Sequence, residues 1–190
     1  LATSSAASDV YKRQIMKLYC FGESGHSYKA ALALQLAEID WTPIFVDFFN
    51  GETRSDQYRN QVNEMGEAPV LVDGDIKLTQ SGVIQNYLYN RTGKHGGKDE
   101  AEKLEILRWI LWDNHKLSSF AGNTRFLMNF FPKDKRPQPV IDFNLARLRS
   151  SYGILENALT DKDFLVGNKI SHADMTCCAY LYYPEPFGFE

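Results

Sequence analysis

Cysteine is scarce in this sequence, and its few cysteines lack the spacing of a metal site or a redox motif. Among 190 residues only Cys20, Cys177 and Cys178 carry a thiol. An odd count with two adjacent members does not suit a disulfide framework. No Cys-x-x-Cys and no zinc-type cysteine and histidine spacing occurs, so we expect no metal. The pattern favours a reducing compartment, most simply the cytoplasm.

Long apolar runs and basic clusters are also lacking. No apolar stretch reaches the roughly 18 residues that a membrane-spanning helix needs, so no membrane span is expected. The 21 basic and 24 acidic residues leave a net charge of -3 without a basic run, which argues against a nucleic-acid partner. The remaining composition, 44% hydrophobic and 24% charged, is ordinary for one large or two small globular domains.

The first fifteen residues differ in character from the rest. Residues 1–15 are rich in alanine and serine and lack the apolar segment of a signal peptide. Met16 is followed directly by strand-like sequence. We therefore interpret residues 1–15 as a non-native or disordered extension and Met16 as the native start.

The next part of the chain alternates between strand and helix patterns. A β-α-β unit within about 35 residues usually forms parallel strands with a right-handed crossover. A turn signal, Asp73-Gly74-Asp75, then predicts a hairpin. This order is typical of a thioredoxin-like α/β domain, which we place at residues 16–92. The expected strands are residues 17–21, 41–49, 68–72 and 76–79, and the expected helices are 28–37 and 81–88.

A glycine-rich polar segment at residues 90–97 marks the domain boundary. Beyond it the patterns are helical, which predicts an all-α domain at residues 98–190. A long helix is expected from residue 98 to about 121, and it is apolar on more than one face. Such a helix packs against more than its own core, which suggests a dimer. A last helix is expected from Ser171 to about Tyr183, opened by a capping box of Ser171 and Asp174.

The turn after the first strand, Ser24-Gly25-His26-Ser27, opens a helix. Its backbone N–H groups and the helix dipole favour an anion. A hydroxyl there can donate a hydrogen bond to a thiolate, and we estimate that this lowers a thiol pKa of about 8.5 by roughly one to two units. The other interpretation of Ser24 is a plain helix cap.

Two further segments, one at Ala68 and Pro69 and one at Gln80 and Ser81, are candidates for binding a peptide ligand. Pro69 enters a strand where it cannot donate to the ladder; a cis Ala68–Pro69 bond would leave the Ala68 backbone available to an extended peptide. Gln80 and Ser81 stand where a strand meets a helix N-terminus, a position suited to a carboxylate. An edge-strand proline and a simple cap are the alternatives.

In this order, GEAPVL, LTQSGVIQNYL and FLVGNKISHADM resemble the glutathione transferase superfamily from about Met16 to the C-terminus. The resemblance implies a thioredoxin-like domain, a helical domain and a homodimer. It also implies detoxification chemistry, in which the thiol of reduced glutathione attacks a small hydrophobic electrophile. Glutathione is then a cosubstrate, and no tightly bound cofactor is implied. The alternatives are a glutathione-dependent disulfide or peroxide reductase, an isomerase, or a non-catalytic binding module.

The resemblance also assigns roles to individual residues. Ser24 matches the activating hydroxyl of serine-type members, with Tyr19 and Ser27 as alternatives. Ala68, before the presumed cis Pro69, matches the residue whose backbone pairs with the cysteinyl part of glutathione, and Gln80 and Ser81 match the pair that holds the γ-glutamyl end. The expected second-substrate pocket is lined by Trp112, His115, Ser119 and Phe120.

Other positions receive no firm role. Asn63 and Glu67 flank the glutathione site without a definite assignment. Cys20 lies within the strand, so a cysteine-type mechanism is not expected. The family pattern continues for further helices after YYPEPFGF, so we expect a C-terminally truncated helical domain.

Overall fold

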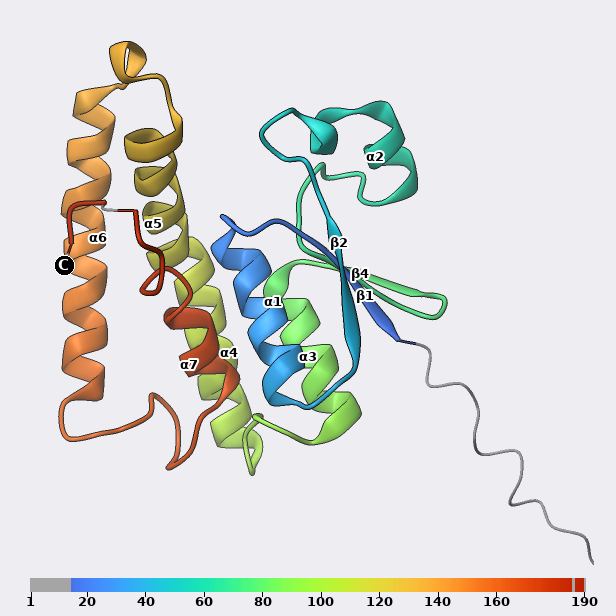
Figure 1. Ribbon diagram of the computed structural model, residues 1–190. Coiled ribbons are helices and arrows are strands. Elements are labelled where there is room, and N and C mark those ends of the chain that lie inside the picture. The colour runs from blue at the N-terminus through green and yellow to red at the C-terminus, as the bar shows by residue number, and fades with distance from the viewer. Residues whose placement is uncertain (1–14, 186, 190) are drawn as a thin grey trace, which may run out of the picture.

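The computed structural model describes residues 15–185 and 187–189 (Figure 1). Nearly all of the extension predicted at residues 1–15 therefore lies outside the described residues. The first half is a four-stranded sheet with strand order β2-β1-β3-β4. Strand β1 runs parallel to β2 and antiparallel to β3, and β4 is antiparallel to β3. This mixed sheet, followed by helices, confirms the predicted thioredoxin-like fold with a helical second part.

The elements of the first half follow the predicted order with adjusted ends. The predicted strand at residues 41–49 ends earlier, and the second predicted helix runs longer, to Thr92. Two short helical segments fill the polar stretch between β2 and β3. The elements are β1 (Met16–Cys20), α1 (Gly25–Leu36), β2 (Trp41–Phe45), η2 (Glu52–Arg54), α2 (Asp56–Gln61), β3 (Val70–Asp73), β4 (Ile76–Thr79) and α3 (Ser81–Thr92).

Helices α1 and α3 lie between the sheet and the helical half (Figure 1). Apolar side chains from the sheet, such as Leu18 and Leu71, pack against Ala33 and Leu34 of α1 and against Ile84 of α3. All five are fully buried. Burying apolar area of this kind contributes about 25 cal/mol per Å², so this face holds α1 and α3 firmly on the sheet.

The helical half contains a helix break that the sequence pattern did not predict. The helix predicted from residue 98 to 121 is divided at Lys116, whose backbone departs from helical geometry (φ -116°, ψ -74°). No proline or glycine stands there. The elements of this half are α4 (Glu100–His115), α5 (Leu117–Arg125), the π-helical turn η3 (Phe126–Phe130), η4 (Lys133–Lys135), α6 (Gln138–Leu159) and α7 (His172–Cys177).

Helix α7 begins where predicted and ends earlier. The capping box is present: the Ser171 hydroxyl accepts from a backbone N–H of the first turn, and the Ser171 N–H donates to the Asp174 carboxylate at 2.8 Å. The helix ends at Cys177 rather than near Tyr183, and turns follow it. None of the described helices has both the length and the apolar character needed to cross a bilayer.

A buried ion pair joins the two halves of the chain. Lys29 of α1 donates to the carboxylate of Asp113 on α4, and both side chains are completely inaccessible to water. The same carboxylate accepts from the hydroxyls of Ser118 on α5 at 2.8 Å and of Thr176 on α7 at 3.0 Å. Four helices therefore meet at one carboxylate. Its charge is compensated by the Lys29 ammonium and by two hydroxyl hydrogen bonds.

We predict that Lys29→Met lowers the free energy of unfolding by about 3–5 kcal/mol, because it leaves the Asp113 charge buried and uncompensated. Urea denaturation measures the change. Lys103→Met is the matched control, since Lys103 forms an exposed ion pair with Glu100 and such pairs contribute about 0–1 kcal/mol. Equal, small losses in both variants would contradict the central role of the buried pair.

Candidate functional site

Two adjoining cavities open beyond the end of β1. The strand-side cavity, of about 470 Å³, is lined by Glu67, Ala68, Pro69, Gln80 and Ser81, among others. The helix-side cavity, of about 430 Å³, is lined by Ser118, Ser119, Gly122, Arg125, Phe130 and Tyr180, among others. Both cavities share Phe21, Ser24, His26, Phe48, Asn114 and Asn123. A group held near Ser24 or His26 would therefore face both cavities.

Ser24 is the N-cap of α1. Its backbone is extended, and its hydroxyl oxygen accepts from the Ser27 N–H at 3.1 Å. That bond uses a lone pair and leaves the hydroxyl proton available to a ligand. The cap interpretation and the donor interpretation of Ser24 are therefore compatible. The start of α1 adds the positive end of a helix dipole.

The two alternative activating hydroxyls lie elsewhere. Neither Tyr19 nor Ser27 lines either cavity. The Ser27 side chain is buried, and its hydroxyl has no hydrogen-bond partner within the described residues. Cys20 belongs to β1, and burial raises the pKa of its thiol. Ser24 is the only one of the candidate hydroxyls that lines the cavities.

The loop before β3 presents Ala68 and Pro69 to the strand-side cavity. The Ala68–Pro69 bond is cis, as presumed from the sequence. The carbonyl of Glu67 accepts two hydrogen bonds, from the Tyr58 hydroxyl and from the Asn63 amide, each at 2.9 Å. Asn63, to which the sequence assigned no role, therefore helps to hold this loop in place.

Gln80 and Ser81 stand at the start of α3 with an unusual backbone. Gln80 has φ +67° and ψ 118°, a conformation that non-glycine residues rarely adopt and that often occurs at functional sites. The Gln80 side-chain amide donates to the Glu67 carboxylate at 2.9 Å. Ser81 is buried, and its hydroxyl lies 3.3 Å from Nδ1 of His26.

His26 belongs to the turn after β1, and the sequence analysis gave it no role. It lines both cavities, and its ring links the start of α1 to the start of α3 through Ser81. Burial, assisted by the charge of Lys29, lowers the pKa of His26 to about 3. The imidazole is therefore neutral near pH 7 and offers one N–H donor and one acceptor.

The four residues expected to line the second-substrate pocket differ in where the structure places them. Ser119 lines the helix-side cavity, whereas Trp112, His115 and Phe120 do not. Trp112 and Phe120 pack against the helical core, and His115 is exposed.

The residues that do line this cavity from α4 and α5 include Asn114, Ser118 and Gly122. Ser118 and Gly122 are spaced four apart and so lie on one face of α5, while Asn114 stands on α4, just before the break at Lys116. An unbroken helix from 98 to 121 does not show the break at Lys116, so the sequence did not predict that Asn114, Ser118 and Gly122 line this cavity.

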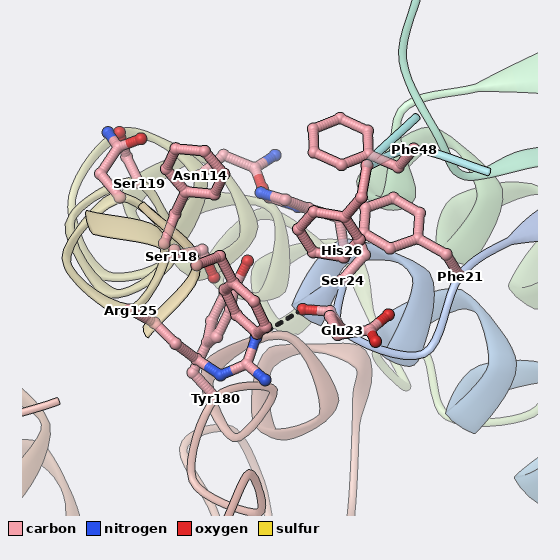
Figure 2. Close-up of a pocket in the computed structure, with 15 residues that line it drawn as sticks. Phe21, Glu23, Ser24, His26, Phe48, Asn114, Ser118, Ser119, Arg125 and Tyr180 are labelled. Atoms are coloured by element: carbon pink, nitrogen blue, oxygen red, sulfur yellow. Dashed lines mark hydrogen bonds between the residues drawn. The ribbon is translucent and has the colours of Figure 1, made fainter. Parts of the chain in front are cut away.

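Aromatic rings and the buried guanidinium of Arg125 also line the helix-side cavity. Phe21 stacks on Phe48 with ring centroids 4.6 Å apart, and Phe49 contacts Phe130 at 5.0 Å. Figure 2 shows Ser118, Ser119, Arg125 and Tyr180 facing Glu23, Ser24 and His26 across the cavity. Burial raises the pKa of Tyr180 to about 12. The cavity suits an apolar or aromatic molecule with few polar groups.

Comparisons with known proteins identify the family of this chain. The family model described as glutathione S-transferase, N-terminal domain, matches residues 15–90, and that of the C-terminal domain matches residues 123–190. Glutathione S-transferase F14 of Arabidopsis thaliana is 28% identical over 174 residues, which cover 88% of this chain and 68% of that protein. Dichloromethane dehalogenase of Methylorubrum extorquens is 28% identical over 142 residues, covering 68% of this chain and 49% of that protein.

Solved structures show the same fold. A structure described as a possible glutathione S-transferase from Rhodopseudomonas palustris has a TM-score of 0.84 and 26% identity, covering 93% of this chain and 87% of that chain. A glutathione transferase from Burkholderia graminis, with two glutathione molecules bound per subunit, has a TM-score of 0.80 and 21% identity. It covers 88% of this chain and 72% of its own.

We predict that His26 makes stability depend on pH. The unfolded imidazole has a pKa of about 6.5 and the folded one about 3, so only the unfolded chain binds this proton between those values. The contribution of His26 to the free energy of unfolding is fully present above pH 6.5 and is lost progressively as the pH falls toward 3. Urea unfolding at pH 7 and pH 5 should show a smaller loss in His26→Asn than in the wild type.

Part of the slope should persist in that variant, because burial also lowers the pKa of His172, to about 4. Equal losses in the wild type and in His26→Asn would show that His26 does not contribute.

Proposed function

The chain belongs to the glutathione transferase superfamily, and on that premise we propose that it activates the thiol of reduced glutathione for attack on a small hydrophobic electrophile. The observation that carries the proposal is the position of Ser24. Its hydroxyl lies at the junction of the two cavities, at the N-terminus of α1, with its proton uncommitted. A hydroxyl and a helix N-terminus are the groups that stabilise a thiolate.

Glutathione would occupy the strand-side cavity. Its γ-glutamyl end would meet Gln80 and Ser81 at the N-terminus of α3, where backbone N–H groups favour a carboxylate. Its cysteinyl part would pair with the backbone of Ala68, beside Pro69. Ser24 lines the same cavity as these two anchoring points, which supports a peptide lying extended with its thiol at Ser24.

In the chemical step, the thiol first releases its proton to solvent, and the Ser24 hydroxyl donates a hydrogen bond to the resulting thiolate. The sulfur then forms a bond to an electrophilic carbon, and the leaving group departs with the bonding electrons. We expect Ser24 and the helix N-terminus to lower the thiol pKa by roughly one to two units, which corresponds to about 1.4–2.7 kcal/mol.

The second substrate would enter the helix-side cavity. Phe21, Phe48 and Phe130 offer ring faces, while Ser118 and Ser119 offer the few polar contacts. Reduced glutathione would serve as the cosubstrate of the proposed reaction. We propose the cytoplasm, where reduced glutathione is available, as the site of action.

A second candidate is a glutathione-dependent disulfide reductase. The two cavities are of similar volume and share Ser24, and the Burkholderia graminis relative holds two glutathione molecules per subunit. Here the activated thiolate would attack a mixed disulfide, form glutathione disulfide and release the other thiol. Assays with chlorodinitrobenzene and with hydroxyethyl disulfide, run side by side, distinguish the two reactions. Failure to bind a glutathione column would favour a non-catalytic module instead.

We predict that Ser24→Ala raises the pKa of the bound glutathione thiol by about 1–2 units and lowers kcat/KM near pH 7 by about 10- to 100-fold. Ultraviolet titration of the thiolate measures the pKa. Ser24→Thr, which keeps a hydroxyl, should retain most of the shift. Ser27→Ala is the matched control, since its buried hydroxyl lines neither cavity. An unchanged pKa in Ser24→Ala would refute Ser24 as the activating group.

A homodimer through α3 and α4 is part of the proposal. Leu104, Leu107 and Leu111 of α4 are 60%, 48% and 61% exposed in the single chain, and Val83 of α3 is 51% exposed. A hollow of about 300 Å³ lies between the two helices. An exposed apolar face of this kind usually marks a protein contact.

We predict that Leu107→Glu converts the dimer to a monomer, because a charge at the centre of the apolar face must lose water on association. Analytical ultracentrifugation measures the mass. Ile154→Glu is the control, since Ile154 is similarly exposed, at 46%, but lies on α6. A wild-type chain that sediments as a monomer would overturn the dimer proposal, whatever the variant does.

A further inference from the structure

The turn that carries Ser24 is held by side chains from the helical half. The carbonyl of Gly22 accepts from the Tyr183 hydroxyl at 2.9 Å, and the carbonyl of Glu23 accepts from Nη1 of Arg125 at 2.7 Å. These two carbonyls directly precede Ser24. Figure 2 shows the Arg125 bond as a dashed line across the edge of the cavity. Turn carbonyls are usually satisfied by nearby backbone or by water, whereas these bonds reach across 161 and 102 residues.

The side chains that make these bonds support one another. The guanidinium of Arg125 lies 3.9 Å from the ring centroid of Tyr183 and pairs with the carboxylate of Glu185 at 2.6 Å. Arg125 is 3% exposed, so its geometry is fixed by these partners rather than by water. The pairing with Glu185 offsets most of the charge, and the contribution of Arg125 at Ser24 is therefore one of position.

A third contact closes the arrangement at the start of α1. A side-chain carbon on Gly25 would lie 2.4 Å from the ring of Tyr180, so only glycine allows this close approach. Tyr180 also lines the helix-side cavity. The residues on both sides of Ser24 are therefore packed or hydrogen-bonded against the segment that follows α7.

We propose that Arg125 and Tyr183 are positioning residues for thiol activation, and that they act by fixing the turn from which Ser24 donates. This inference rests on the proposed function. The strength of a hydrogen bond to a thiolate depends on donor distance and angle. Without the hydrogen bonds from Arg125 and Tyr183, the turn would allow Ser24 to adopt orientations in which its hydroxyl does not reach the sulfur. The helical half would thus set the thiol pKa in addition to lining the second cavity.

The test uses Tyr183→Phe, which removes one hydroxyl and keeps the ring against Arg125. We expect the pKa of bound glutathione to rise by about half a unit, which corresponds to an approximately threefold lower thiolate fraction near pH 7. Affinity for S-methylglutathione, whose thiol is blocked, should not change. Tyr89→Phe is the matched control: its hydroxyl also donates to a glycine carbonyl, that of Gly97 at 3.1 Å, but far from the turn in sequence.

Arg125→Gln should raise the thiol pKa further, by about one unit, and Arg125→Lys should restore part of the shift. Because loss of a buried arginine can unfold the chain, the decisive comparison is the double variant Ser24→Ala/Tyr183→Phe. If Tyr183 acts through Ser24, its substitution adds nothing in the Ser24→Ala background, since the donor is already absent.

The outcomes separate the two proposals. A rise in pKa in Ser24→Ala with none in Tyr183→Phe overturns the positioning role and leaves Ser24 as the activating group. Equal, additive rises in both backgrounds mean that Tyr183 acts independently of Ser24, which also overturns the inference. No change in Ser24→Ala removes the premise, and the proposed activation and the positioning role fail together. A rise in Tyr183→Phe that disappears in the double variant supports it.

Discussion

The ion pair between Lys29 and Asp113 determines how the two halves of the chain meet. Both charges are shut off from water, so each depends on the other and on the hydroxyls of Ser118 and Thr176. A buried pair of this kind tolerates little change in spacing, because any separation leaves a charge without compensation. Lys29 follows Ser24 on α1, and Asp113 precedes the cavity residue Asn114 on α4. The pair therefore joins the helix that begins after Ser24 to the helix that carries the cavity residue Asn114.

The electrostatics of the strand-side cavity favour an anionic peptide. The N-termini of α1 and α3 both meet it, at Ser24 and Ser81, and each contributes free backbone donors and the positive end of a dipole. His26 connects the two helix starts while staying neutral, because burial makes its protonated form costly. The site therefore gains hydrogen-bonding capacity without a second titrating charge, and the proposed thiolate is stabilised by dipoles rather than by a formal cation.

Local patterns predicted the elements well where each element obeys its own periodicity. The β-α-β unit, the hairpin at Asp73 and the capping box at Ser171 all follow from short-range rules. The errors occur where long-range contacts intervene. The break at Lys116 has no local signal and accompanies the bond from Ser118 to Asp113. The last helix stops at Cys177, before Tyr180 and Tyr183 turn toward the first half. Trp112, His115 and Phe120, which were expected to line the pocket on the basis of an unbroken helix, do not line the helix-side cavity.

The sequence by itself determined the fold class and the family, because the motifs that carry them are contiguous and their backbone geometry is local; the strand-side residues are predictions from the same motifs. Ser24, Pro69 and Ser81 occupy turn or helix-start positions that the surrounding few residues specify. Only the tertiary structure decided which residues line the helix-side cavity and what His26 contacts. The same holds for the hydrogen bonds from Arg125 and Tyr183 to the turn. They depend on which faces of α1, α4 and α5 are brought together, and a buried ion pair between residues 84 positions apart leaves no periodic trace in the sequence.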